Sequence, residues 1–207
     1  MTVSIILRDY VASVVDSPLA PLADLSPWAL VSDSVELVAG LLLTLDPEQY
    51  SIEGDIAVHR SAMVEAGAVL KGPLIIGADC FIASGAYLRG GCWLAERCII
   101  GPGAELKSSF VFAGSKLAHF NFVGDSVLGA GVNLEAGSIV CNYRNERADK
   151  QVRVRVGDRL VDTGCEKFGA LLGDGVRLGA NAVLAPGAIL MPGHVIRRAA
   201  LYDGEES

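Results

Sequence analysis

An aliphatic residue occupies every sixth position over the first half of the chain. The first series is Val58, Val64, Leu70, Ile76, Ile82, Leu88, Leu94, Ile100 and Leu106. The pattern resumes in a new phase as Phe122, Leu128, Leu134 and Val140, and again as Leu172, Leu178, Leu184, Leu190 and Ile196. A period of six matches neither the 3.6 of a helix nor the 2 of an ordinary strand, and it is typical of short strands wound into a β-helix. We therefore expect an all-β fold.

The remaining positions of each hexad support this interpretation. The third residue after the aliphatic one is usually Gly, Asp or Asn, as at Gly85, Asp125 and Asn181. These residue types tolerate a positive φ, so each hexad carries its own corner. The fourth residue after it is mostly small, as at Ala86 and Cys98, which suits a tight interior corner.

Composition limits the function classes. Of the 207 residues, 51% are hydrophobic, as a continuous stacked core requires. The net charge of −7 argues against general attraction to nucleic acid or anionic membranes. The longest apolar stretch, 38–45, is too short to span a bilayer. Three of the five cysteines (Cys80, Cys92 and Cys98) fall in the small-residue position, so we expect reduced, core-filling cysteines in a cytoplasmic protein.

The hexad pattern divides the chain into two domains. Residues 1–50 lack the hexad and are predicted to form a helical N-terminal cap. A candidate helix over 33–45 follows Ser32 and ends before Pro47, and Ser26-Pro27 offers an earlier helix start. Residues 51–207 form the predicted β-helix domain and end in an acidic tail.

The repeat is interrupted over 142–170, which we interpret as an inserted loop and β-hairpin. Residues 152–156 alternate strictly between Val and Arg, Gly157-Asp158 supplies a turn, and 159–161 supply a second strand. Seven of the seventeen basic residues fall in this insertion: Arg144, Arg147, Lys150, Arg153, Arg155, Arg159 and Lys167. They form either a solvated hairpin or a binding surface for a polyanionic cofactor such as coenzyme A.

Two further features suggest chemistry. Lys71, Arg89 and Lys107 are eighteen residues apart, which is one coil of three hexads, so they should stack about 4.8 Å apart as a column of cations. A bound phosphate would explain such a column, although basic side chains also fan out into solvent. Between Phe112 and Phe122 there are ten residues where six are expected, which predicts a bulge that contains His119. Histidine is the usual general base near neutral pH.

Four segments carry a more specific resemblance: 86–91, 104–109, 118–125 and 132–143. In residue type, order and spacing they resemble the acetyltransferase domain of bifunctional N-acetylglucosamine-1-phosphate uridylyltransferase/glucosamine-1-phosphate acetyltransferases. They also resemble the C-terminal domain of archaeal sugar-1-phosphate nucleotidylyltransferases, and the β-helical match covers about 58–198. The resemblance implies a left-handed parallel β-helix of hexapeptide repeats.

The resemblance also implies roles for individual residues. The catalytic set is His119 as the general base, Glu105 as the carboxylate that orients it, and Asn142 near the acyl group. The substrate-binding set is Arg89, Lys107, Asn133 and Tyr143, to which the column adds Lys71. For the cofactor we select Lys150, Arg153, Arg155 and Lys167 from the basic insertion, and we expect no metal. Phe122 stands where the family has a phosphate-binding tyrosine, so a bare sugar 1-phosphate should bind more weakly than in that family.

We therefore expect a homotrimeric acyltransferase that uses acetyl-CoA, or another acyl-CoA, and acts on an amino sugar phosphate or a nucleotide sugar by direct attack on the thioester. One alternative is an O-acyltransferase that uses acyl carrier protein (acyl-ACP) and a UDP-sugar. Another is a non-catalytic trimeric scaffold. A γ-class carbonic anhydrase shares this fold, but His59, His119 and His194 lack the close spacing of its zinc triad.

Overall fold

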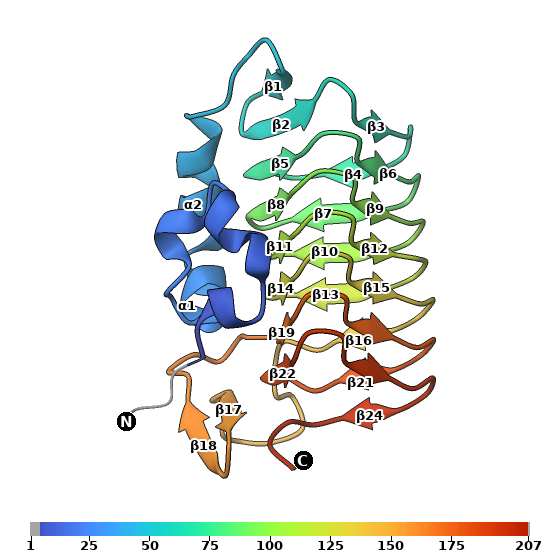
Figure 1. Cartoon of the computed structure of the whole chain (residues 1–207). Helices are drawn as coiled ribbons and strands as arrows, with labels where there is room; N and C mark the ends of the chain where they lie inside the picture. Colours follow the sequence, from blue (N-terminus) through green and yellow to red (C-terminus); the bar gives the residue numbers. More distant parts are fainter. Residues whose placement is uncertain (1–4, 207) are drawn as a thin grey trace.

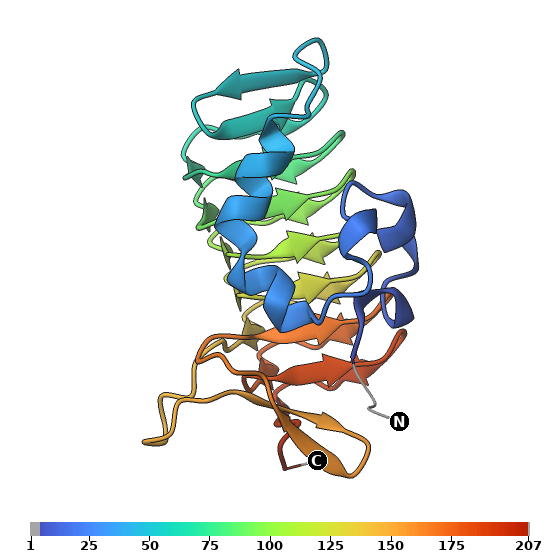
Figure 2. The ribbon, with the colours of Figure 1, turned by 90° about the vertical axis from the view of Figure 1, so that its left-hand side faces the viewer.

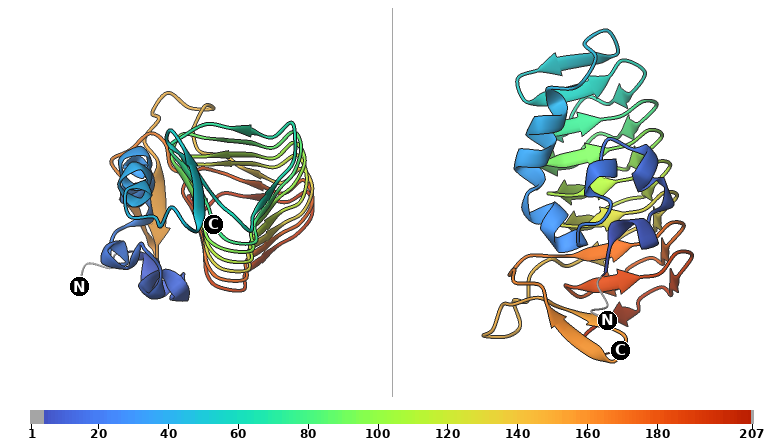
Figure 3. Two further views of the ribbon diagram at one scale, coloured as in Figure 1. Left: turned by 90° about the horizontal axis from the view of Figure 1, so that it is seen from above. Right: turned by 60° about the vertical axis from the view of Figure 1, so that its left-hand side comes forward.

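The computed structural model describes residues 5–206, which wind into a left-handed parallel β-helix with three flat faces, as predicted (Figure 1). Each coil contributes one short strand to each face. We call the three parallel sheets face A, face B and face C. Seen from above, they enclose a triangular core (Figure 3).

Each face stacks the equivalent strand of successive coils. Face A consists of β1 (Tyr50–Glu53), β2 (Ile56–His59), β5 (Leu74–Ile76), β8 (Cys92–Leu94), β11 (Phe110–Val111), β14 (Val127–Leu128), β19 (Ala170–Leu172) and β22 (Ala188–Leu190). Face B consists of β3 (Met63–Val64), β6 (Phe81–Ile82), β9 (Ile99–Ile100), β12 (Lys116–Leu117), β15 (Asn133–Leu134), β20 (Arg177–Leu178) and β23 (Val195–Ile196). Face C consists of β4 (Val69–Leu70), β7 (Tyr87–Arg89), β10 (Glu105–Lys107), β13 (Phe122–Gly124), β16 (Ile139–Val140), β21 (Val183–Leu184) and β24 (Leu201–Tyr202). All neighbours pair in parallel except β1 with β2.

The core is the column of inward-facing aliphatic side chains that the hexads predict. Leu88, Leu94 and Ile100 are fully buried, as are most of their equivalents in the other coils. Cys80, Cys92 and Cys98 fill the small positions between them, which confirms their predicted role. All five cysteines are free.

The predicted bulge around His119 was wrong. The register pairs Leu94 with Val111 and Val111 with Leu128, a step of seventeen residues instead of eighteen. One residue is therefore missing at each of two corners between face C and face A, and no residues are inserted between Val111 and Val140. Val111 and Val123 face inward, where the hexad count had placed Phe112 and Phe122. His119 consequently lies at an ordinary corner between face B and face C.

The N-terminal segment is helical, as predicted. It contains three 3-10 turns and two α-helices: η1 (Leu7–Asp9), η2 (Ala12–Asp16), η3 (Ala20–Leu22), α1 (Pro27–Ser32) and α2 (Ser34–Leu42). Both predicted helix starts are used, because Ser26 precedes α1 and Asp33 precedes α2. Residues 1–4 of the predicted cap lie outside the described range.

This segment lies along the outside of face A rather than over the end of the β-helix (Figures 2 and 3). Leu30 and Val38 belong to the same buried cluster as Trp93 and Phe110 of face A. Face A is therefore buried on both sides, whereas no helix of the described residues covers face B or face C.

The insertion forms the predicted hairpin. β17 (Arg153–Val156) pairs antiparallel with β18 (Arg159–Asp162). Val152 and Val154 are buried in the same cluster as the N-terminal helices. No helix within residues 5–206 has the length and apolar character needed to cross a bilayer.

Candidate functional site

The cations at eighteen-residue spacing form one column on face C. The β7–β10 register places Arg89 directly beside Lys107. The backbone N–H of Lys71 donates to Leu88 O at 2.9 Å, which places Lys71 beside Arg89 on the other side. The column therefore runs along the edge of face C that borders face A.

Carboxylates pair with two of these cations. Nε of Arg89 lies 2.8 Å and Nη2 lies 2.7 Å from Oε1 of Glu105. Nζ of Lys107 lies 2.8 Å from both carboxylate oxygens of Asp125. Lys71 has no carboxylate partner within residues 5–206, and its Nζ lies 5.2 Å from the centre of the Tyr87 ring. The column is thus held in place by neighbours that a bound anion would have to displace or share.

Asp125 is a site residue that sequence reasoning did not single out. It occupies a corner with φ of 47° and is 7% exposed. Besides pairing with Lys107, its carboxylate accepts a hydrogen bond from the side-chain amide of Asn142. Asn142 can lie there because Gly124 has no side chain: a Cβ on Gly124 would come within 2.7 Å of the amide nitrogen of Asn142. The structure therefore brings Asn142 to the cation column.

His119 lies at the opposite edge of face C. Its side chain is exposed and has no hydrogen-bond partner in the described part of the chain. Gly124, which pairs with Lys107, lies five positions after His119 in the chain, so the distance between the Cα atoms of His119 and Gly124 is at most about 18 Å. Glu105, the predicted orienting carboxylate, is bonded to Arg89 rather than to His119.

The residue after His119 is unusual. Phe120 has a φ of 52°, a conformation that bulky residues rarely adopt, and its side chain is 70% exposed. Its ring lies over the corner glycine of the preceding coil, where a Cβ on Gly103 would come within 2.5 Å of it. An exposed aromatic ring therefore stands beside the candidate base at the corner between the two uncovered faces.

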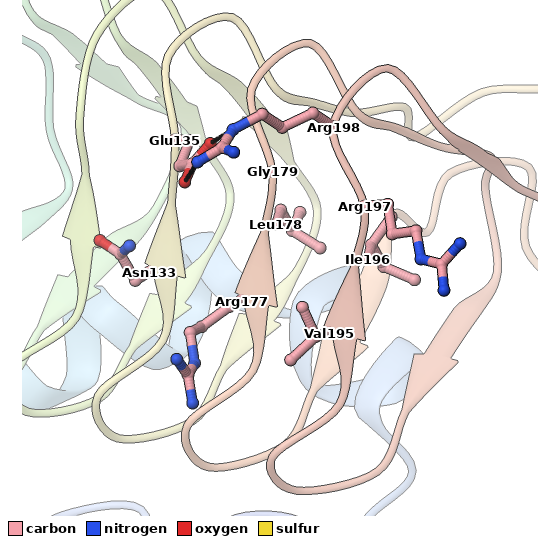
Figure 4. A pocket seen from close by; sticks show the side chains of 9 residues that line it. All are labelled: Asn133, Glu135, Arg177, Leu178, Gly179, Val195, Ile196, Arg197 and Arg198. Carbon is pink, nitrogen blue, oxygen red and sulfur yellow. Dashed lines mark hydrogen bonds and ion pairs between the residues drawn. The ribbon is translucent and has the colours of Figure 1, made fainter.

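Asn133 lies on face B rather than on face C. It lines a pocket of about 460 Å³ with Glu135, Arg177, Arg197 and Arg198 (Figure 4). Arg198 donates two hydrogen bonds to Glu135, at 2.8 and 2.7 Å. The single chain thus does not bring Asn133 together with Arg89 and Lys107.

The predicted cofactor residues separate into two groups. The first group lies within the insertion. Nζ of Lys150 donates to two backbone carbonyls and lies 5.2 Å from the ring centre of Tyr143. Arg153 pairs with Asp149, and Arg155 donates to two backbone carbonyls of the C-terminal segment. Lys167 is exposed elsewhere, in a pocket of about 390 Å³ that Ser108 and Asp125 also line.

The acidic C-terminal segment binds the start of the insertion. Arg144, which is 3% exposed, donates to both oxygens of Asp203 at 2.6 and 2.8 Å. Arg147 donates to both oxygens of Glu205 at 2.7 and 3.1 Å. Much of the positive charge predicted for the insertion is therefore neutralised within the chain. Beside these pairs lies a pocket of about 590 Å³ that includes Tyr143.

The three histidines are far apart along the chain and lie on different coils. His59 ends β2, His119 precedes β13, and His194 precedes β23. Among residues 5–206, no three His, Cys, Asp or Glu side chains are grouped so that they could hold a metal ion.

The chain matches known proteins in both repeat and sequence. Residues 73–108 match the family model "bacterial transferase hexapeptide (six repeats)". The chain is 33% identical over 163 residues to the bifunctional sugar-1-phosphate nucleotidylyltransferase/acetyltransferase of Sulfurisphaera tokodaii, which covers 79% of this chain and 39% of that protein. It is 30% identical over 100 residues to the bifunctional protein GlmU of Methanococcus maripaludis, which covers 48% and 24%.

Together with the fold, these matches make the chain similar to the hexapeptide-repeat transferases. Within that class it is similar to the bifunctional sugar-1-phosphate enzymes, although it spans about 39% of the length of the Sulfurisphaera relative. Among solved structures, PerB from Caulobacter crescentus in complex with coenzyme A and GDP-perosamine aligns with 20% identity over 70% of this chain and 50% of that chain, with a TM-score of 0.32.

Proposed function

We propose that this chain is an acyltransferase that moves an acetyl or longer acyl group from coenzyme A to an amino sugar phosphate or a nucleotide sugar. One observation carries the proposal. Face C holds a column of cations at one edge and, at the other, the histidine that aligns with the family's general base. A phosphorylated acceptor that lies across the face would reach both edges.

The acceptor phosphate is assigned to Arg89 and Lys107, with Lys71 beside them. Arginine binds phosphate with two parallel N–H donors, and lysine adds a point charge. Both side chains point outward, because the residue directly before each of them, Leu88 or Leu106, faces the core and successive side chains of a strand alternate. A phosphate would compete with Glu105 and Asp125 for these cations, and displacement from Arg89 would free Glu105 to orient His119.

His119 acts as the general base in this scheme. A thioester donor supplies an electrophilic carbonyl when it is bound. As the acceptor amine or hydroxyl attacks that carbonyl, His119 takes its proton and later returns it to the leaving thiolate. The side-chain amide of Asn142, or a backbone N–H, donates to the oxyanion. Tyr143 would position the acyl group beside Asn142.

A homotrimer would complete the site. Face A is covered by the chain's own N-terminal segment, which leaves face B and face C as the uncovered sheets on which a neighbour would pack. A three-fold arrangement brings two different surfaces together at each interface. With the exposed Phe120 corner toward the axis, face C of one subunit would meet face B of the next. Asn133 of the partner subunit would then approach the column of Arg89 and Lys107.

The donor is expected to be coenzyme A rather than a carrier protein. The residues assigned to it are Lys167, which is exposed beside Asp125, and Lys150, Arg153 and Arg155, which would have to exchange their present contacts.

Release of free thiol tests the proposal directly. Acetyl-CoA would be incubated with a panel of sugar phosphates and nucleotide sugars, including glucosamine 1-phosphate. We expect acceptor-dependent thiol release with at least one phosphorylated amino sugar. A trimer that releases no thiol with any acceptor, from acyl-CoA or acyl carrier protein, would instead support the scaffold alternative.

A further inference from the structure

A pocket of about 390 Å³ lies at the corner between face C and face A, beside the cation column. Its floor is polar, because Ser34, Ser108 and Asp125 line it and are at most 8% exposed. Ser108 follows Lys107 in the chain, and Asp125 is the carboxylate that pairs with Lys107. The pocket therefore begins where the column ends, on the side of the column that faces away from His119.

One wall of this pocket comes from the N-terminal helices, through Ser32 at the end of α1 and Val35 near the start of α2. The wall lies close to face C because Gly91 has no side chain: a Cβ there would lie 2.7 Å from the backbone carbonyl carbon of Ser34. The Ser34 hydroxyl donates to the carbonyl oxygen of Gly90 at 3.3 Å, in the corner that follows β7. The N-terminal segment is thus attached to the coil that carries the column.

The opposite wall is the end of the insertion, residues 165–167. Phe168, which follows it, is fully buried, and its ring packs edge-on against Trp28 of α1 with 5.9 Å between the ring centres. The backbone N–H of Gly169 donates to the carbonyl oxygen of Asp125 at 2.8 Å. Figure 2 shows the insertion, in orange, beside the lower end of the N-terminal helices. The two walls are therefore joined to each other and to the floor of the pocket.

The pocket suits an uncharged group with hydrogen-bonding edges. Among the described residues that line it, Lys167 is the one cation, against two carboxylates. Serine hydroxyls supply donors and acceptors, and Val31 and Val35 give the pocket an apolar side. A ribose with its heterocyclic base combines flat apolar faces with polar edges, and the volume lies within the range of small-molecule sites. A phosphate would instead bind the neighbouring column, where the cations gather.

A ligand held on the column by its phosphates can extend in two directions. Across face C it approaches His119, and around the corner it enters the pocket. A sugar 1-phosphate carries a substituent on one side of its phosphate only, whereas a nucleotide sugar carries a sugar at one end of its diphosphate and a nucleoside at the other. The two directions thus match the two ends of a nucleotide sugar.

We infer that the acceptor is a nucleotide sugar, whose diphosphate lies on Arg89 and Lys107 and whose nucleoside occupies this pocket. The inference rests on the proposed function for the direction in which the sugar points. It moves Lys167 from the donor to the acceptor and leaves the donor Lys150, Arg153 and the other basic residues of the insertion.

Binding measurements test the inference without turnover. UDP-N-acetylglucosamine, dTDP-glucose, GDP-mannose and N-acetylglucosamine 1-phosphate would be titrated by calorimetry into the wild type, Ser32→Trp and Val35→Trp. Each indole adds bulk at the rim of the pocket and leaves the column residues in place. We expect the Kd of at least one nucleotide sugar to rise about tenfold in both variants. The Kd of the sugar 1-phosphate should stay within about twofold, which also shows that the variants are folded.

Val15→Trp is the matched control, because Val15 is also an exposed valine of the N-terminal segment and does not line the pocket. The inference is overturned if no nucleotide sugar binds more tightly than the sugar 1-phosphate, or if Val15→Trp has the same effect as Val35→Trp. A loss of coenzyme A affinity alone in Ser32→Trp and Val35→Trp also overturns it, because the pocket would then hold the donor.

Thiol release separates this inference from the proposed function. If the nucleotide-sugar effect holds but no acceptor releases thiol from acetyl-CoA, the proposed function fails and the nucleoside pocket stands. If glucosamine 1-phosphate alone is acetylated, with kinetic constants that Ser32→Trp and Val35→Trp leave unchanged, the proposed function stands and the inference fails.

Discussion

Lys107 and Asp125 are eighteen residues apart and form an ion pair in which the lysine Nζ lies 2.8 Å from both carboxylate oxygens. Their side chains are only 17% and 10% exposed, which makes this pair the best shielded contact of the cation column. Since Asp125 also accepts the Asn142 amide, it joins a predicted phosphate ligand to a predicted acyl-positioning residue.

Asp125→Asn should weaken this link without changing the corner, because Asn also tolerates a positive φ. Loss of a charge-assisted hydrogen bond should lower the free energy of unfolding by about 1.5–3 kcal/mol. Urea unfolding of Asp125→Asn, Lys107→Met and the double variant measures the coupling between the two side chains. Additive effects of the two substitutions would show that the pair contributes nothing.

Phe120→Asp should dissociate the proposed trimer. An exposed Phe with a positive φ is costly unless a neighbouring subunit buries it, and a carboxylate at that corner would be repelled by its symmetry mates. Sedimentation equilibrium should show a trimer for the wild type and for Leu160→Asp, which changes another exposed apolar residue on the hairpin. A fully active wild-type monomer would contradict the assembly.

Most of the fold could be predicted from the hexads, but the phase shift could not. The hexad pattern requires one inward-facing apolar residue per strand. In Phe110-Val111-Phe112 all three residues are apolar, so the sequence fits Val111 as the inward residue as well as it fits Phe112. All three side chains are buried, because the N-terminal segment covers the outer surface of face A. Alternation between buried and exposed positions, which would have fixed the phase, is therefore absent there.

The site was predictable only in part for a related reason. A spacing of eighteen correctly placed Arg89 beside Lys107, because strand register follows the coil length. The sequence gives no sign that the basic insertion is neutralised by Asp203 and Glu205, because those partners lie 58 or more residues away. The pairing of Glu105 with Arg89 was equally hidden, since it depends on side-chain direction on a shared face.

Asp203→Asn should lower stability more at neutral pH than in acid. The hydrogen bonds from Arg144 hold the pKa of the Asp203 carboxyl below its ordinary value of 3.8. A depressed carboxyl pKa stabilises the fold above the unfolded-state value, and this contribution is lost as pH falls through the folded-state value. Urea unfolding at pH 7 and pH 3 should show a stability difference from the wild type that narrows in acid. An equal gap at both pH values would contradict this role.

Arg89→Ala should weaken acceptor binding selectively. A lost charge-assisted contact to phosphate corresponds to a rise in acceptor KM of about tenfold to a hundredfold, with the donor KM nearly unchanged. Steady-state kinetics with both substrates varied separate the two constants, and Arg8→Ala serves as a control. A rise in donor KM alone would show that the cation column binds the cofactor instead of the acceptor. No change in either constant would show that the column binds neither substrate.

His119→Ala tests the central claim most directly. Thiol release would be measured for this variant and for His194→Ala, which removes an exposed histidine near the far end of the β-helix. Loss of a general base should lower kcat by about 10²–10⁴-fold, with coenzyme A affinity unchanged by calorimetry. His194→Ala should retain wild-type kcat. Near-full activity in His119→Ala would show that the chain does not use this histidine as its base.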